Sequence, residues 1–265
     1  MEQFESIKSK ERVKELGEVF TPKEIVEDML GLVDKASIED MGDKVPTGYR
    51  GYSYDLDKTF LEPSCGTGNF LVEIVARKCE TAISESKIEG SEQVDIDKLK
   101  TNLLKAVATV YGVDIMPDNV NESRKRVTEV IEGLYKEKLQ VDISRYFRKT
   151  LEYIIERNIV LGNTLEYSMY FEFPNEGAKG KNKKAKTNKE SGLMFKGVLQ
   201  KDSDTRDLEF SEWKFEDNYV TRLAYRLKED KLKDTYDKVH YSKLYDLGDK
   251  KERDMLEDNA LNWNY

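Results

Sequence analysis

The chain has 265 residues, of which 36% are charged and 38% hydrophobic, and its formal net charge is −8. This composition predicts a heavily charged surface around one domain with additions. No apolar run approaches the ~20 residues of a membrane-spanning helix, and the N-terminus lacks a signal-peptide pattern, so we expect no membrane partner. The acidic balance argues against tight autonomous DNA binding, because DNA-binding domains usually carry a basic footprint.

The chain contains two cysteines, Cys65 and Cys79. Two cysteines make neither a disulfide framework nor a zinc-binding spacing. We therefore expect free thiols, no metal site and a cytoplasmic location.

The N-terminal part, residues 1–58, is predicted to be a helical segment. Thr21 suits the N-cap of a helix, Pro22 its first position, and Glu24 completes a capping box. Apolar residues at helical spacing continue to Val33. Earlier in the chain the sequence predicts a charged helix at 5–16, and after Val33 a loop at 35–58.

Residues 59–175 show strands alternating with helices. This alternation predicts an α/β fold with a doubly wound, mostly parallel sheet. Ligands of such sheets bind at the carboxyl ends of the strands, where Glu62, Asp114 and Asn163 are predicted to lie. The predicted strands are 59–61, 107–113 and 159–161. The predicted helices are 69–86, a further one starting at 99–104, 118–134 and 143–155.

The C-terminal part divides into two segments. Residues 176–192 are rich in lysine and predict a flexible, solvated loop, or an arm that meets DNA phosphates. Residues 193–265 predict a β-hairpin, with strands at 208–215 and 219–227, followed by a charged helical tail.

The run TFLEPSCGTGNFL at 59–71 reads as a strand, a glycine turn and a helix N-terminus. The glycines let the backbone approach a ligand closely, and the free N–H groups of the helix start favour a polar or anionic group. Taken alone, the pattern is equally consistent with an ordinary turn between a strand and a helix.

Four segments carry a resemblance to a known family. The run at 60–71 resembles motif I of the N6-adenine-specific DNA methyltransferases of restriction-modification and phage type, whose loop binds S-adenosylmethionine (SAM). GEVFTPKEI at 17–25 resembles their N-terminal motif, which contacts the methionine end of SAM. VYGVDI at 110–115 is similar to motif II, and NIVLGNTL at 158–165 to motif III. The resemblance covers roughly residues 10–168 and implies a Rossmann-like fold of the SAM-dependent methyltransferase type.

The resemblance also implies a set of cofactor contacts. Asp114 would accept hydrogen bonds from the ribose hydroxyls, Ile115 would pack on the adenine, and Asn163 would contact the adenine amino group. A turn or cap role remains the alternative for Asp114 and Asn163, and Cys65 is expected to be a packing residue of the loop. The candidate cofactor-binding residues are Phe20, Thr21, Glu62, Pro63, Ser64, Cys65, Gly66, Gly68, Asn69, Phe70, Asp114, Ile115, Asn163 and Leu165.

The acceptor motif of the family, Asn/Asp-Pro-Pro-Tyr/Phe, is not present in this sequence. The chain has no Pro-Pro pair, and Phe173-Pro-Asn-Glu176 is a poor match near the expected place. The catalytic residues therefore stay unassigned. Three interpretations remain: an adenine-specific DNA methyltransferase with a diverged acceptor loop or one supplied by a second subunit, a SAM-binding regulatory or assembly protein without catalysis, and a methyltransferase with another acceptor.

Overall fold

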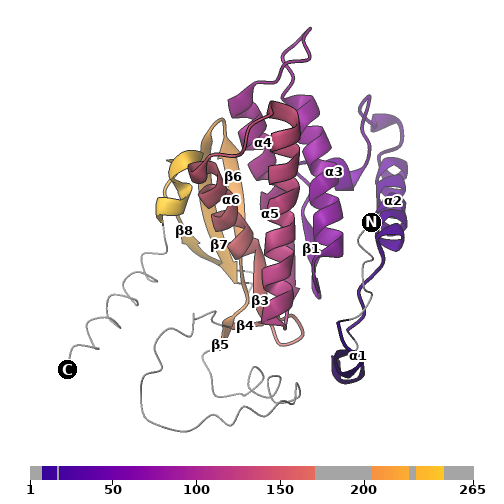
Figure 1. Cartoon of the computed structure of the whole chain (residues 1–265). Coiled ribbons are helices and arrows are strands. Elements are labelled where there is room, and N and C mark those ends of the chain that lie inside the picture. Colours follow the sequence, from indigo (N-terminus) through magenta and orange to yellow (C-terminus); the bar gives the residue numbers. More distant parts are fainter. Residues whose placement is uncertain (1–7, 17, 171–204, 227–230, 248–265) are drawn as a thin grey trace, which may run out of the picture.

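The structure is a computed structural model that describes residues 8–16, 18–170, 205–226 and 231–247 (Figure 1). It is an α/β fold. The helices are α1 (Lys10–Leu16), α2 (Lys23–Met41), α3 (Asn69–Glu85), α4 (Ile96–Ala108), α5 (Pro117–Leu139) and α6 (Arg145–Asn158), with short 3-10 helices η1 (Gly42–Lys44), η2 (Tyr52–Tyr54) and η3 (Tyr241–Leu247). The strands are β1 (Phe60–Glu62), β2 (Val110–Asp114), β3 (Ile159–Asn163), β4 (Ser168–Tyr170), β5 (Thr205–Asp207), β6 (Glu209–Glu216), β7 (Tyr219–Arg226), β8 (Lys231–Thr235) and β9 (Val239–His240).

The main sheet has the strand order β1-β2-β3-β4-β5. Strands β1, β2 and β3 are parallel, whereas β4 and β5 add to β3 as antiparallel strands. The sheet is therefore mixed, with parallel pairing where the motifs lie. Because β1 and β2 are parallel neighbours, their carboxyl ends meet at one edge of the sheet, as the sequence predicts.

The helices of the β1-β2-β3 unit form one group. Helix α3 contacts α4 and α5, and α6 contacts the same two helices. Right-handed crossovers that advance in one direction place their helices on a single face of a sheet. In the described residues the strand order does not reverse. The doubly wound sheet that the sequence predicts, with helices on both faces, is therefore not seen in them.

The second sheet consists of β6, β7, β8 and β9. Its strand β6 contacts α4 and α6, and the start of β6 packs against the other face of the main sheet. Val113 and Val160 of the main sheet form a small apolar cluster with Leu208 and Phe210. The hydroxyl of Tyr111 in β2 donates to the carbonyl of Ser211 in β6, at 2.6 Å. The pairing of β6 with β7 confirms the predicted hairpin, whose turn is Asp217-Asn218.

Asn158, at the end of α6, connects the helices with both the main sheet and the second sheet. Its side-chain amide is fully buried and donates to the carbonyls of Val107, Ala108 and Val110, where α4 passes into β2. Its side-chain oxygen accepts from the indole N–H of Trp213 in β6, at 2.9 Å. One amide thus fixes both the start of β2 and the position of the second sheet.

The predicted capping box of α2 is wrong. The N-cap is Pro22, which has an extended backbone (ψ 153°), and no side chain caps the helix. A proline disfavours helical backbone in the residue before it, so Thr21 stays outside the helix. The helix also continues to Met41, through residues that were predicted to be a loop.

Tertiary contacts explain the extra length of α2. Asp34 accepts hydrogen bonds from the backbone N–H and the hydroxyl of Ser53, at 2.7 and 2.6 Å, and pairs with Arg77 of α3 at 3.0 Å. Gly51 passes so close that a Cβ atom there would lie 2.3 Å from that of Asp34. These polar contacts between distant segments leave no periodic apolar signal in the sequence.

Two further boundaries differ from the prediction. Residues 107 and 108, predicted to begin a strand, complete α4, which starts earlier than expected because the carboxylate of Asp95 caps the N–H groups of Asp97 and Lys98. The predicted helical tail contains the strands β8 and β9, which pair with β7. Pairing on both sides of β7 satisfies the backbone groups that an edge strand would leave open.

Several predictions fall on residues outside the described ranges. They include all of the lysine-rich segment 176–192, all of Phe173-Pro-Asn-Glu176, and the tail beyond residue 247. Within the part of the chain that the structure describes, no helix has both the length and the apolar character needed to cross a membrane.

We expect Asp34→Ala to lower the free energy of unfolding by about 3 kcal/mol, since it leaves the buried Arg77 guanidinium without its Asp34 partner and Ser53 without its acceptor. Chemical denaturation monitored by circular dichroism measures this loss. Asp28→Ala, at an exposed position of the same helix, is the control and should change stability by less than about 0.5 kcal/mol. Equal losses in the two variants would contradict the role given to Asp34.

Candidate ligand-binding site

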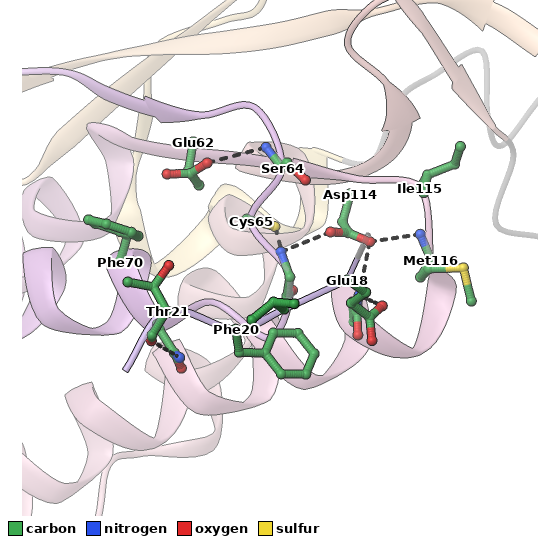
Figure 2. A pocket seen from close by; sticks show the side chains of 14 residues that line it. Glu18, Phe20, Thr21, Glu62, Ser64, Cys65, Phe70, Asp114, Ile115 and Met116 are labelled. Atoms are coloured by element: carbon green, nitrogen blue, oxygen red, sulfur yellow. Dashed lines mark hydrogen bonds between the residues drawn. The ribbon is translucent and has the colours of Figure 1, made fainter. Parts of the chain in front are cut away.

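A cavity of about 180 Å³ opens at the carboxyl ends of β1 and β2 (Figure 2). Three segments that are far apart in the sequence form its wall: the stretch before α2, the loop between β1 and α3, and the start of α5. The lining residues are Glu18, Val19, Phe20, Thr21, Glu62, Ser64, Cys65, Gly66, Asn69, Phe70, Asp114, Ile115, Met116 and Asn119.

The two loop glycines, Gly66 and Gly68, have different structural roles. Both have positive φ angles, +51° at Gly66 and +85° at Gly68, which favour glycine. A Cβ atom at Gly66 would lie 3.0 Å from the ring of Phe20, whereas one at Gly68 would meet Ser123 of α5 at 3.0 Å. Gly66 therefore keeps the cavity wall open, and Gly68, which does not line the cavity, lets α5 approach the loop.

A hydrogen bond fastens the N-terminal segment to this loop. The side-chain amide of Asn69 donates to the backbone carbonyl of Thr21, at 2.8 Å. Arg126 of α5 in turn donates to the side-chain oxygen of Asn69 and to the carbonyl of Thr67, both at 2.7 Å. Phe20 and Thr21 are thus held at the cavity through bonds to backbone and amide groups.

Asp114 ends β2 and connects the loop with the start of α5. One carboxylate oxygen accepts from the backbone N–H of Gly66, at 2.8 Å, and the other from the N–H of Met116, at 2.8 Å, and the amide of Asn119, at 3.2 Å. Burial raises the pKa of Asp114, and these hydrogen bonds act in the opposite direction. Since a carboxylate has about four acceptor positions, roughly one remains for a ligand.

Glu62 ends β1 and stands at the opposite side of the loop from Asp114 (Figure 2). One of its carboxylate oxygens accepts from the backbone N–H of Ser64, at 3.3 Å. Burial raises the pKa of Glu62 above its ordinary value. The cavity therefore carries carboxylates at two separate places, which suits an elongated ligand with hydrogen-bond donors at both ends.

Cys65 lines the cavity but has the character of a packing residue. It is buried, and its sulfur lies near Gly112 of β2 and Ser123 of α5. Burial raises the pKa of the Cys65 thiol to about 12. The thiol is therefore protonated and unreactive at neutral pH.

Four predicted residues do not line the cavity. They are Pro63, Gly68, Asn163 and Leu165. The side-chain oxygen of Asn163 accepts from the backbone N–H of Leu165, at 3.0 Å, which is a turn contact, and Leu165 is 92% exposed. The carbonyl of Pro63 accepts from the hydroxyl of Thr164, at 2.8 Å, and so joins the end of β3 to the loop.

Sequence reasoning missed four lining residues: Glu18, Val19, Met116 and Asn119. Glu18 and Val19 lie within the motif-like run at 17–25, and Met116 and Asn119 closely follow the run at 110–115. The amide of Asn119 donates to both Glu18 and Asp114, at 3.1 and 3.2 Å. Membership of a motif run, or a place beside one, was the available signal, but these bonds depend on how three segments come together.

Among the residues described, no group of three or more His, Cys, Asp and Glu side chains could hold a metal ion.

Comparison with known proteins adds no family assignment: no protein-family model, no curated protein and no solved structure gives a significant match to this chain.

Proposed function

We propose that the chain binds SAM in this cavity and is the cofactor-binding part of an N6-adenine DNA methyltransferase-like protein of the cytoplasm. The observation that carries the proposal is the convergence of three separate motif segments on one cavity. Phe20 and Thr21, Gly66, and Asp114 with Ile115 all line it, although 48 residues separate Gly66 from Asp114 along the chain. The parallel β1-β2-β3 unit with its helices is compatible with a Rossmann-like methyltransferase domain.

The residues present fit such a ligand. Gly66 provides a cradle that a Cβ atom would narrow, Ile115 offers an apolar surface for adenine, and Asp114 keeps an acceptor position for a ribose hydroxyl. Glu62 is a suitable partner for the ammonium group of the methionine part, near Phe20 and Thr21. When bound, SAM supplies an activated methyl group on its sulfonium.

The acceptor of the methyl group needs a binding site of its own. Methyl transfer requires the acceptor nitrogen to be held in line with the methyl group. The sequence lacks the family's acceptor tetrapeptide. Among the described strands, β1, which precedes the glycine loop, pairs only with β2, so no described strand lies on its other side to carry an acceptor loop. We therefore propose that a second subunit supplies the acceptor loop and contacts to DNA.

The absent tetrapeptide also supports a second candidate function. A protein that retains the SAM cavity without an acceptor loop would act as a SAM-binding regulatory or assembly protein. A methyltransferase with an acceptor other than DNA is a further alternative, for which the cavity gives no specific support.

Asp114→Ala should weaken SAM binding by about 1–3 kcal/mol, which corresponds to roughly 5- to 150-fold in the dissociation constant. The variant removes a ribose acceptor and releases the N–H groups of Gly66 and Met116. Isothermal titration calorimetry with SAM measures the effect. Asp34→Ala removes another buried aspartate away from the cavity and should bind SAM normally while folded. Unchanged affinity in Asp114→Ala would exclude this residue from the site.

Gly66→Ala should reduce SAM affinity at least 10-fold, because the added methyl group presses on the Phe20 ring and strains a positive φ angle. Gly90→Ala is the matched control. Gly90 also has a positive φ, of +73°, but a Cβ atom there would have nothing within 4 Å. We expect Gly90→Ala to cost stability without changing SAM affinity; equal affinities in both variants would mean that the Gly66 loop is only structural.

Transfer of radiolabelled methyl groups from SAM to unmethylated DNA tests the activity. We expect no transfer by the purified chain alone and transfer after addition of extract from its native cells. SAM binding without transfer in either condition would favour the non-catalytic function. Absence of SAM binding would refute the proposal itself.

A further inference from the structure

Glu18 carries an unexplained feature of the cavity. Its side chain is 9% exposed and lines the cavity, and its Oε1 atom is buried without a hydrogen-bond partner in the described residues. Buried carboxylate oxygens are normally satisfied, so an unpaired one at a cavity wall indicates a missing donor. The donor is expected to come from a bound ligand.

The other oxygen of Glu18 is held firmly. Oε2 accepts from the Nε atom of Arg12, at 3.0 Å, and from the amide of Asn119, at 3.1 Å. Arg12 also pairs with Asp118, at 2.6 Å, which fixes the guanidinium against the start of α5. Because Oε2 already accepts from three N–H donors, two of Arg12 and one of Asn119, Oε1 is the atom left for a ligand. The last torsion of a glutamate side chain is soft, so Oε1 can adjust to a donor that enters the cavity.

The position of Glu18 next to Asp114 identifies the kind of donor. Figure 2 shows the two carboxylates on the same side of the pocket. The Asn119 amide bridges them, since it donates to Oε2 of Glu18 and to Oδ1 of Asp114. Asp114 has about one acceptor position left, and Glu18 has its unpaired Oε1. Two neighbouring acceptors match two neighbouring hydroxyl groups.

A ligand cation is a weaker match for Glu18. The Arg12 guanidinium already bonds to this carboxylate, and desolvated charge pairs gain little from a second cation at the same place. Neutral hydroxyl donors satisfy the unpaired oxygen without adding charge to a buried position.

We propose that Glu18 and Asp114 together clamp the vicinal hydroxyls of a ribonucleoside, with Glu18 Oε1 accepting from one hydroxyl and Asp114 from the other. This inference rests on the proposed SAM site and extends it, because it divides between two residues the contact expected of Asp114 alone. The clamp makes the site selective for ribonucleosides over their deoxy analogues.

Calorimetric titration of the full chain tests the clamp, with S-adenosylhomocysteine and its 2′-deoxy and 3′-deoxy analogues as probes. The wild-type chain should bind each deoxy analogue about 10-fold or more weakly, because each lacks one of the two hydroxyls and loses one hydrogen bond to a charged acceptor. A loss for only one of the analogues would overturn the division of the contact between two residues. Equal affinities for all three probes would overturn the clamp while leaving the proposed SAM site intact. Failure to bind any of them would overturn the proposed function as well.

The Glu18→Gln variant tests whether Glu18 is the residue that contacts one of the ribose hydroxyls. The amide oxygen of the glutamine must face the donors Arg12 and Asn119, so the NH₂ group replaces the unpaired acceptor. We expect about 10-fold weaker binding of S-adenosylhomocysteine and little change for the analogue that lacks the hydroxyl facing Glu18. An equal loss for all probes would contradict this role.

Glu24→Gln is the matched control for that variant. It makes the same substitution at an exposed position of α2 outside the cavity lining. Its affinities and its discrimination between the probes should equal those of the wild type. Thermal unfolding of both variants shows that the comparison is made on folded protein.

Discussion

The candidate site depends on the hydrogen bonds that the carboxylate of Asp114 accepts. It ends β2, accepts the backbone N–H of Gly66 from the loop after β1, and accepts the N–H of Met116 where α5 begins. Two adjacent parallel strands and the helix that follows are thereby joined at one carboxylate group. Together with the backbone bond from the N–H of Cys65 to the carbonyl of Val113 in β2, at 2.9 Å, it fixes the loop against β2 and so holds one wall of the cavity.

The N-terminal segment completes the cavity by a different kind of contact. Asn69, at the start of α3, holds the carbonyl of Thr21, and Arg126 holds Asn69. On the opposite side, Arg12 bonds to Glu18 and pairs with Asp118 at the start of α5. The segment before α2 is thus tied to the core at both ends, which explains how residues so far from the glycine loop come to lie across it.

Burial gives the cavity its chemical character. It raises the pKa of Glu62, of Asp114 and of the Cys65 thiol, because each charged form is poorly solvated there. Hydrogen bonds from the backbone offset this effect at both carboxylates. The result is a polar cavity whose acceptor atoms are fixed by hydrogen bonds.

The sequence by itself was sufficient for the central α/β unit. Short β-branched strands, the glycine turn after Glu62 and the long apolar-periodic helices are local patterns, and the structure has them near the expected places. It also placed Glu62, the glycine loop and Asp114 at the carboxyl ends of two strands, because a strand followed by a turn and a helix is a local pattern. It did not reveal the length of α2 or the strands after β7, since these depend on contacts with distant segments.

Only the tertiary structure decided which motif residues share a cavity. Asn163 ends a strand as Asp114 does, yet its side chain closes a turn, and Leu165 faces solvent. Glu18 lies in the motif-like run at 17–25, but the sequence does not show that one of its oxygens is unpaired, which arises because Arg12 and Asn119 occupy the other oxygen. The physical reason is general: periodicity and turn residues act between near neighbours in the chain, whereas the pairing of buried polar atoms is settled when separate segments pack together.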